Sequence, residues 1–247
     1  NHRLNIPTLL MADIIHGFRT IFPIPLALGS TWDEAAVEKM AEISAKEAAV
    51  SGLHVTFSPM VDLVRDPRWG RVMESTGEDP LLNSRLADAM VRGYQGENLK
   101  EDNWRVAACV KHFAAYGGAL AGRDYNTVDM SERQLREMYL PGYKAGLDAG
   151  AKLVMTSFNT VDGIPATGNQ WLFRDVLRNE FGFEGVVISD WGAIKELIPH
   201  GVAKDEKQAA ELAIKAGVDI EMMTTCYPDY LKELLEEGRI AETLIDE

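Results

Sequence analysis

The chain has 247 residues, a formal net charge of −13 at pH 7 and hydrophobic residues at 46 % of its positions. This length suits one α/β barrel or one large two-layer domain, either with a full core. The charge argues against nucleic acids and anionic membranes as partners, and no apolar stretch is long enough to span a bilayer. Cys109 and Cys226 stand apart from each other and from any His/Cys cluster. We therefore predict no disulfide framework, no metal site and no cofactor.

Segments typical of strands and helices alternate along the chain. The expected strands cover residues 6–13, 53–57, 106–110, 153–156, 185–190 and 218–222, with one further short apolar run at 24–28. The expected helices cover residues 35–51, 80–95, 131–149, 171–181, 209–216 and 230–237. This alternation predicts a parallel sheet flanked by helices. No linker interrupts it, so we expect one domain over residues 1–247.

The number of strands bears on the type of sheet. Six or seven strands can be counted, whereas a closed barrel needs eight. An open doubly wound sheet is the alternative, but no glycine-rich phosphate-binding turn follows any strand. We predict an α/β fold of the (β/α)8 TIM-barrel type, incomplete in this chain. The chain begins with Asn1 and ends on Glu247 just after an expected helix. We therefore expect it to be a piece of a longer polypeptide.

The apolar run 185–188 leads directly into Ser189, Asp190 and Trp191. Three β-branched residues in a row suit a strand that is buried on both faces. Barrel enzymes carry their active sites at the carboxyl ends of such strands. Asp190 is therefore the candidate nucleophile; the alternative is that Ser189 or Asp190 only caps the next helix.

Charged, amide and aromatic residues follow the other expected strands too. They are Asp13, Arg65, Arg68, Arg71, Lys111, His112, Phe158, Asn159 and Trp191. Carboxylates and a lysine hydrogen-bond hydroxyl groups, arginine orients a carboxylate, and an aromatic ring stacks on a sugar. The set predicts a site for a polyhydroxylated ring. Taken singly, Asp13 could be a helix cap, His112 a buried core residue and Trp191 a core aromatic.

Several stretches are similar to motifs of one enzyme family. They are Met11-Ala12-Asp13 to Gly17, Ser58 to Asp62, Asp66-Pro67-Arg68-Trp69-Gly70-Arg71, Gly77 to Asp79, Val110 to Phe113, Tyr125 to Ser131, Tyr139 to Pro141, and Val187 to Trp191. Together they resemble the N-terminal catalytic barrel of glycoside hydrolase family 3 over nearly the whole chain. The similarity is greatest to the bacterial periplasmic β-glucosidase branch. The N-acetylglucosaminidase branch carries a different loop after Lys-His-Phe, where this chain has Ala114-Ala115-Tyr116-Gly117.

The resemblance implies a retaining β-glycosidase with Asp190 as the nucleophile. It further implies that Asp13, Arg71, Lys111 and His112 hold the reacting sugar and that Trp191 lines the aglycone subsite. A periplasmic or secreted location is expected. In this branch the acid/base glutamate comes from a C-terminal domain, which the 247 residues lack. Three glutamates within the chain could compete for that role, and we interpret them as structural: Glu74, Glu78 and Glu221.

Three other functions stay open. A β-xylosidase of the same family differs only in the sugar accepted. Lys111 at a strand end could form a Schiff base in a lyase, although nearby carboxylates would favour its charged ammonium form. A carbohydrate-binding fragment without turnover is the third.

Overall fold

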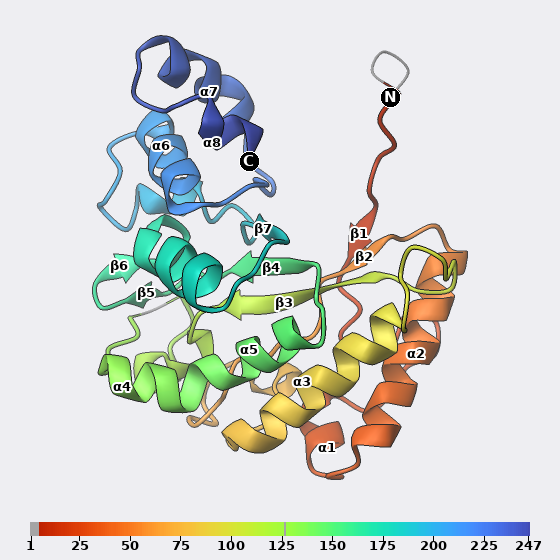
Figure 1. Cartoon of the computed structure of the whole chain (residues 1–247). Helices are drawn as coiled ribbons and strands as arrows, with labels where there is room; N and C mark the ends of the chain where they lie inside the picture. Colours follow the sequence, from red (N-terminus) through yellow and green to blue (C-terminus); the bar gives the residue numbers. More distant parts are fainter. Residues whose placement is uncertain (1–4, 126) are drawn as a thin grey trace.

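The computed structural model describes residues 5–125 and 127–247. Residues 1–4 and Asn126, which belongs to the 125–131 motif, lie outside the described residues. Five strands form one parallel sheet in the order β1 (Met11–Ala12), β2 (Val55–Thr56), β3 (Ala107–Phe113), β4 (Leu153–Thr156) and β7 (Val186–Ile188) (Figure 1). A parallel bridge between Ile188 and Ile220 places the segment around Ile220 next to β7, at the end of this order. The alternating, parallel, incomplete barrel predicted from the sequence is confirmed for this part of the chain.

Helices cover the outer face of the curled sheet (Figure 1). The longer ones are α2 (Glu34–Val50), α3 (Pro80–Gln95), α5 (Leu140–Asp148), α6 (Glu206–Ala216), α7 (Cys226–Glu236) and a π-helix over Trp171–Glu180. The shorter ones are α1 (Pro25–Gly29), α4 (Glu132–Gln134), which continues through a π-helical turn into α5, and α8 (Thr243–Asp246). A small antiparallel hairpin joins β5 (Thr160–Val161) to β6 (Ile164–Pro165).

Side-chain caps explain where the major helices begin. Asp33 accepts the backbone N–H of Ala36 at the start of α2, at 3.0 Å. Asp79, followed by a proline at the first helical position, accepts the N–H of Leu82 at 2.8 Å and starts α3. These are the residue types that satisfy the free N–H groups of a helix terminus. The predicted span 80–95 is therefore confirmed to the residue.

Both faces of the sheet are apolar, as a buried parallel sheet requires. On the outer face, Ala108, Val110, Val154 and Val187 belong to the large core shared with the helices. On the inner face the strands contribute a second cluster: Val55, Phe57, Ala107, Cys109, Leu153, Met155 and Ile188. Both cysteines are buried free thiols. Because successive side chains of a strand point to opposite faces of the sheet, the position of a residue at a strand end decides which face its side chain is on.

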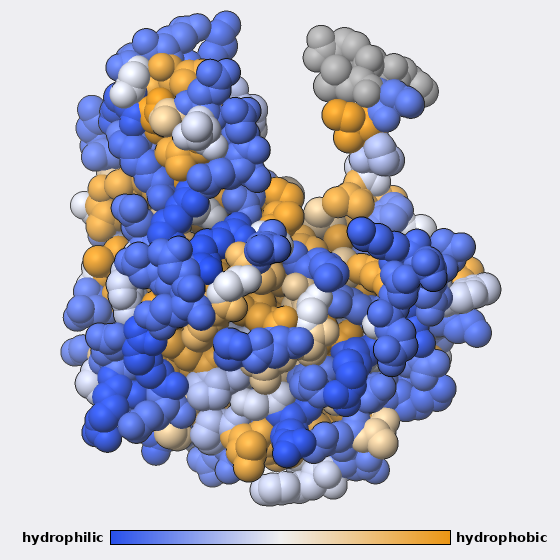
Figure 2. All heavy atoms as spheres, in the orientation of Figure 1, coloured by the Kyte–Doolittle hydropathy of each residue, from blue (hydrophilic) through white to orange (hydrophobic). Residues whose placement is uncertain are grey.

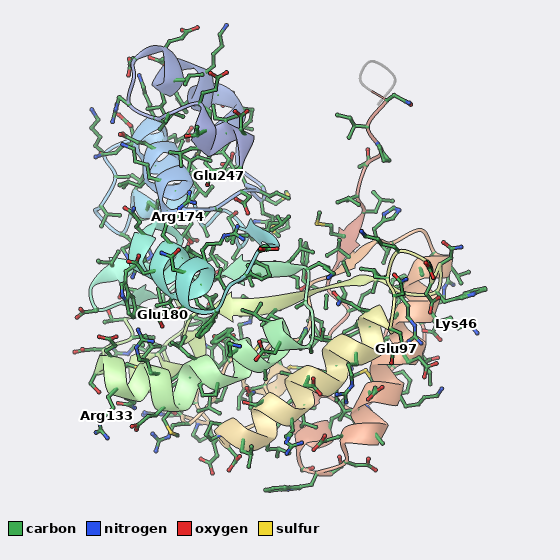
Figure 3. All side chains as sticks on the ribbon, viewed as in Figure 1. Lys46, Glu97, Arg133, Arg174, Glu180 and Glu247 are labelled. Carbon is green, nitrogen blue, oxygen red and sulfur yellow. The ribbon has the colours of Figure 1, made fainter. Side chains whose placement is uncertain are left out.

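The surface is largely hydrophilic, with hydrophobic residues visible in the hollow between the N-terminal segment and the α6–α8 region (Figure 2). Exposed large apolar side chains include Ile6, Leu9, Leu10, Trp191 and Met223. Charged side chains form ion pairs on the outside, and Arg174 binds Glu247 at 2.6 Å, joining the π-helix to the C-terminal residues (Figure 3). No helix in the two described ranges has the length and apolar character to cross a membrane.

Three sequence-based expectations were wrong in detail. The run 24–28 is not a strand: Pro25, fixed in helical φ, opens α1 there. In the segment 6–13 only Met11 and Ala12 pair with β2, because the segment is at the edge of the sheet and its first residues are exposed. In 218–222 only Ile220 pairs with the sheet.

Candidate active site

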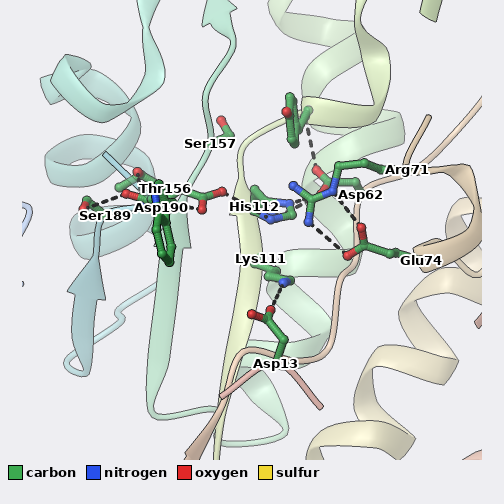
Figure 4. Close-up of polar contacts among 12 residues, drawn as sticks. Asp13, Asp62, Arg71, Glu74, Lys111, His112, Thr156, Ser157, Ser189 and Asp190 are labelled. Atoms are coloured by element: carbon green, nitrogen blue, oxygen red, sulfur yellow. Dashed lines mark hydrogen bonds and ion pairs between the residues drawn. The ribbon is translucent and has the colours of Figure 1, made fainter. Parts of the chain in front are cut away.

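Most of the residues predicted from the strand ends come together at the carboxyl edge of the sheet: Asp13, Arg71, Lys111, His112 and Asp190 (Figure 4). Arg65 lines a separate groove, and Arg68 pairs with Asp66 on the surface. β3 carries Lys111 and His112, and β7 leads into Ser189 and Asp190. After β2 the chain stays beside β3, because the N–H of Val61 donates to the carbonyl of Lys111 at 2.8 Å. The next residue along, Asp62, is thereby placed against His112.

Asp190 is 8 % exposed and one of its carboxylate oxygens has a partner. Its Oδ1 accepts the N–H of Trp191 at 2.7 Å. Its Oδ2 has no hydrogen-bond partner among the described residues and faces Nε2 of His112 at 3.4 Å. The helical turn that follows, Lys195–Leu197, has no side-chain cap, and the next long helix, α6, is capped by Asp205. The helix-cap interpretation of Asp190 is therefore wrong, and a carboxylate oxygen is left for chemistry.

The turn that carries Asp190 is fixed by backbone and hydroxyl contacts. The N–H of Asp190 donates to Oγ1 of Thr156 at 3.2 Å. Ser189 donates its N–H to the carbonyl of Ile220 at 2.8 Å, and its Oγ accepts the N–H of Met222, also at 2.8 Å. Strand β4 on one side and residues 220–222 on the other thus hold the candidate nucleophile in place.

His112 and Asp62 form a buried pair. Nδ1 of His112 lies 2.7 Å from Oδ2 of Asp62, and the two side chains are 1 % and 0 % exposed. Burial raises the pKa of Asp62 to about 6, and hydrogen bonds from Tyr143 and His112 offset part of that rise. Burial lowers the pKa of His112 well below its usual value. The imidazole is therefore neutral at pH 7.

Arg71 is bound by two nitrogen atoms to Glu74. The distances are 2.7 Å from Nε to Oε1 and 3.0 Å from Nη2 to Oε2. The guanidinium also lies over the Tyr116 ring, 5.6 Å from its centroid. Burial would raise the pKa of Glu74, but the hydrogen bond and charge of Arg71 outweigh it and the pKa is lowered. Glu74 thus acts as a charged partner that orients Arg71.

Lys111 is buried and directed toward Asp13. Its Nζ lies 2.7 Å from Oδ1 of Asp13. This pairing engages the ammonium group with a carboxylate, an arrangement that suits binding of hydroxyl groups. It does not suit a lysine that must lose its proton to attack a carbonyl.

The two predicted aromatic residues differ in exposure. Trp191 is 62 % exposed, so the core interpretation is wrong and its ring is available as a platform. Phe158 is 5 % exposed and packs against Tyr125, with ring centroids 4.3 Å apart. Contact between Phe158 and a sugar stays a prediction.

The other two candidate glutamates lie elsewhere. Glu221 accepts the N–H of Cys226 at 2.9 Å and that of Tyr227 at 2.7 Å, and so caps α7. Glu78 lines a separate groove together with Trp32 and Arg65. Across residues 5–125 and 127–247, no group of three or more His, Cys, Asp or Glu side chains is arranged to hold a metal ion.

Asp62, Tyr116 and Tyr143 were not recognised as site residues from the sequence. Asp62 ends the Ser58–Asp62 motif, which was the available signal. Its function follows from a contact with His112, fifty positions away.

The assembled site can be set against known proteins. The profile of the family described as "Glycosyl hydrolase family 3 N terminal domain" matches residues 1–247. The chain belongs to this family.

Named relatives agree with the family match. The chain is 49 % identical over 245 residues to the periplasmic beta-glucosidase of Salmonella typhimurium, covering 99 % of the chain and 32 % of that protein. It is 36 % identical over 267 residues to a beta-xylosidase of Formosa agariphila, covering 100 % of the chain and 37 % of that protein. A crystal structure of beta-glucosidase from Listeria innocua in complex with glucose is 64 % identical and superposes with a TM-score of 0.98, over 99 % of this chain and 34 % of that one. The chain thus spans about a third of the length of these relatives.

Proposed function

We propose that this chain carries the nucleophile and most of the sugar-binding groups of a retaining β-glycosidase, with β-glucosidase as the favoured activity. The observation that carries the proposal is Oδ2 of Asp190 at the carboxyl edge of the sheet, which has no hydrogen-bond partner within residues 5–125 and 127–247. Around it are an imidazole, a buried lysine and an arginine, which can bind hydroxyl groups, and an exposed indole, which can stack on a sugar.

In the first step Asp190 forms a bond from a carboxylate oxygen to the anomeric carbon of the sugar. The bond from that carbon to the leaving oxygen breaks, and the leaving oxygen takes a proton from a general acid. In the second step the same group, now a base, removes a proton from water. The water oxygen then bonds to the anomeric carbon and frees Asp190, so the configuration is retained.

The general acid is proposed to come from a C-terminal domain, from residues beyond the 247 of this chain. In retaining enzymes the two carboxyl groups are about 5–5.5 Å apart. Within the chain, Glu74 is bound to Arg71 and Glu221 caps α7. Neither has a carboxyl group free to protonate a leaving oxygen.

The β-xylosidase alternative is supported by the similarity of the chain to the beta-xylosidase of Formosa agariphila. The β-glucosidase reading is favoured because two beta-glucosidases share 64 % and 49 % identity with the chain, against 36 % for the xylosidase. By analogy with the Salmonella protein, we also propose a periplasmic location.

Covalent trapping tests the proposal in the complete natural polypeptide. A 2-deoxy-2-fluoro β-glucoside with a good leaving group should label the peptide that contains Ser189, Asp190 and Trp191, and Asp190→Asn should abolish the label. A label on another peptide would reassign the nucleophile. Binding of the sugar without any label would favour a non-hydrolytic carbohydrate protein. Borohydride-dependent capture of a carbonyl substrate on Lys111 would favour the lyase.

A further inference from the structure

The buried carboxylate of Asp62 is not needed for the bond changes proposed above, yet it has more hydrogen-bond donors than any other side chain of the site. Its Oδ1 accepts the N–H of Tyr116 at 3.1 Å and lies 2.6 Å from the hydroxyl of Tyr143. Its Oδ2 accepts the backbone N–H of His112 at 3.0 Å and lies 2.7 Å from Nδ1 of the same residue.

These contacts fix which partner holds the proton. A backbone N–H can only donate, so each oxygen of Asp62 is already committed as an acceptor. Backbone N–H groups donate to both oxygens, and the single hydrogen of the Tyr143 hydroxyl is within reach of Oδ1 and of the carbonyl oxygen of His112, each at 2.6 Å. These surroundings suit an ionised carboxylate. Nδ1 of His112 must then carry a hydrogen and donate it to Oδ2. Because a neutral imidazole has one N–H, Nε2 is left with a lone pair.

The surroundings of Nε2 agree with this assignment. Nε2 lies 3.4 Å from Oδ2 of Asp190, beyond the usual range of about 2.7–3.2 Å for an N–H···O hydrogen bond. Besides burial, the positive charges of Arg71 and Lys111 also lower the pKa of His112, while Asp190 and Glu74 act in the opposite direction. Two acceptors, Nε2 of His112 and Oδ2 of Asp190, therefore face each other at the base of the site (Figure 4).

We infer that Asp62 is a positioning residue: it holds His112 as the Nδ1–H tautomer, so that Nε2 accepts a hydrogen bond and selects a sugar that offers a hydroxyl donor there. The inference deepens the proposed function and rests on it for the identity of the ligand. The tautomer itself does not depend on the ligand. A hydroxyl at this place can donate a hydrogen bond to Nε2. A fluorine or an ether oxygen has no hydrogen to donate, so its lone pairs would repel the lone pair of Nε2.

Nitrogen NMR tests the tautomer without any assay. The complete polypeptide is labelled with ¹⁵N at histidine, and the ring signals of His112 are identified by their loss in His112→Gln. We expect a protonated Nδ1 and an unprotonated Nε2 at pH 7. A neutral ring with the proton on Nε2 would overturn the inference, whether or not the protein hydrolyses glycosides.

Variants of Asp62 test the consequence. Asp62→Asn keeps the shape of the side chain but leaves one acceptor oxygen in place of two, and Asp62→Ala leaves none. In both we expect the Nε2 signal to move toward its protonated position and kcat/KM to fall by about 10²-fold, as for misplacement of a binding group. Thr56→Val is the matched control, because it removes a buried hydroxyl that has no hydrogen-bond partner among the described residues. This control should leave both readouts unchanged.

Substrate analogues separate this role from a merely structural one. The analogues are aryl glycosides in which one hydroxyl at a time is replaced by fluorine. For the wild-type protein, kcat/KM should fall by about 10²-fold when the replaced hydroxyl is the one that donates to Nε2 of His112. In Asp62→Asn the fall in kcat/KM caused by this fluorine should be about tenfold smaller, because a protonated Nε2 does not set a lone pair against the fluorine. Equal penalties in both proteins at every position would overturn the role of Asp62 in selection. Circular dichroism of each variant checks folding, and the wild-type NMR result stands even if both variants fail to fold.

Discussion

Nζ of Lys111 lies 2.7 Å from Oδ1 of Asp13, although the lysine side chain is 3 % exposed and the aspartate side chain 62 % exposed. The pair thus joins a buried cation on the central strand to a solvated carboxylate on the edge strand. An ion pair with one solvated partner contributes little to stability. Its value is in presenting one donor and one acceptor side by side, as adjacent sugar hydroxyls require.

The Lys111 pair gives the first prediction. Lys111→Met should lower kcat/KM by about 10- to 100-fold, the range expected for loss of a hydrogen bond to a charged group. Part of the loss should be in kcat, because such contacts strengthen in the transition state. Lys39→Met is the control: it breaks a surface pair with Glu42, also at 2.7 Å, and should leave kinetics unchanged. Wild-type kinetics in Lys111→Met would remove this residue from the site.

Trp191 gives the second prediction. Its exposed indole is expected to cover the aglycone, so Trp191→Ala should raise KM for a disaccharide by about tenfold, the lower end of the burial energy of a large apolar side chain. Trp104→Ala is the control, since Trp104 is 54 % exposed but precedes β3 and so lies at the opposite end of that strand from His112. Equal effects in the two variants would count against an aglycone platform.

The raised pKa of Asp62, about 6, gives the third prediction. Below that pH the carboxyl becomes protonated and no longer accepts the Nδ1–H of His112, so kcat/KM should fall on the acid side of pH 6. In Asp62→Asn this limb should be absent, because an amide does not titrate there.

Stability distinguishes this effect from acid unfolding. The folded pKa of Asp62 is above its ordinary value of 3.8, so the folded state binds this proton more tightly than the unfolded state. The contribution of Asp62 to stability is therefore fully present below about pH 4 and is lost as pH rises through 6. Activity should thus fall between pH 7 and 5 without a loss of stability that is due to Asp62. An acid limb that is unchanged in Asp62→Asn would assign it to another group.

The sequence was sufficient to predict the residues that follow strands. Lys111, His112 and Asp190 come directly after buried apolar runs, and in a parallel sheet such positions meet at one edge. The role of Asp62 could not be predicted in this way. It lies in a loop, and its place depends on the continued pairing of Val61 with Lys111 after β2 has ended. The residues around it belong to packing between distant segments, which periodicity does not encode.

The shortest elements were also poorly predicted. Residues 6–13 and 218–222 have strand-like composition, yet only Met11, Ala12 and Ile220 pair with the sheet. Composition reports how apolar a segment is, whereas pairing depends on which neighbour lies beside it. The central strands were predicted better because both of their neighbours are present in the chain.

Glu221 gives the last prediction, which bears on the source of the general acid. Both of its carboxylate oxygens accept N–H groups at the start of α7, and one of them also contacts the hydroxyl of Thr224. Glu221→Gln should therefore lower the free energy of unfolding by about 1 kcal/mol, as for loss of a helix cap. It should leave unchanged the dependence of kcat on the pKa of the leaving phenol. Loss of the true general acid would do the opposite. It would slow glycosides with poor leaving groups by about 10²–10⁴-fold and spare those with good ones. If Glu221→Gln showed that selective loss, the acid would lie within this chain and the proposed external carboxyl group would be wrong.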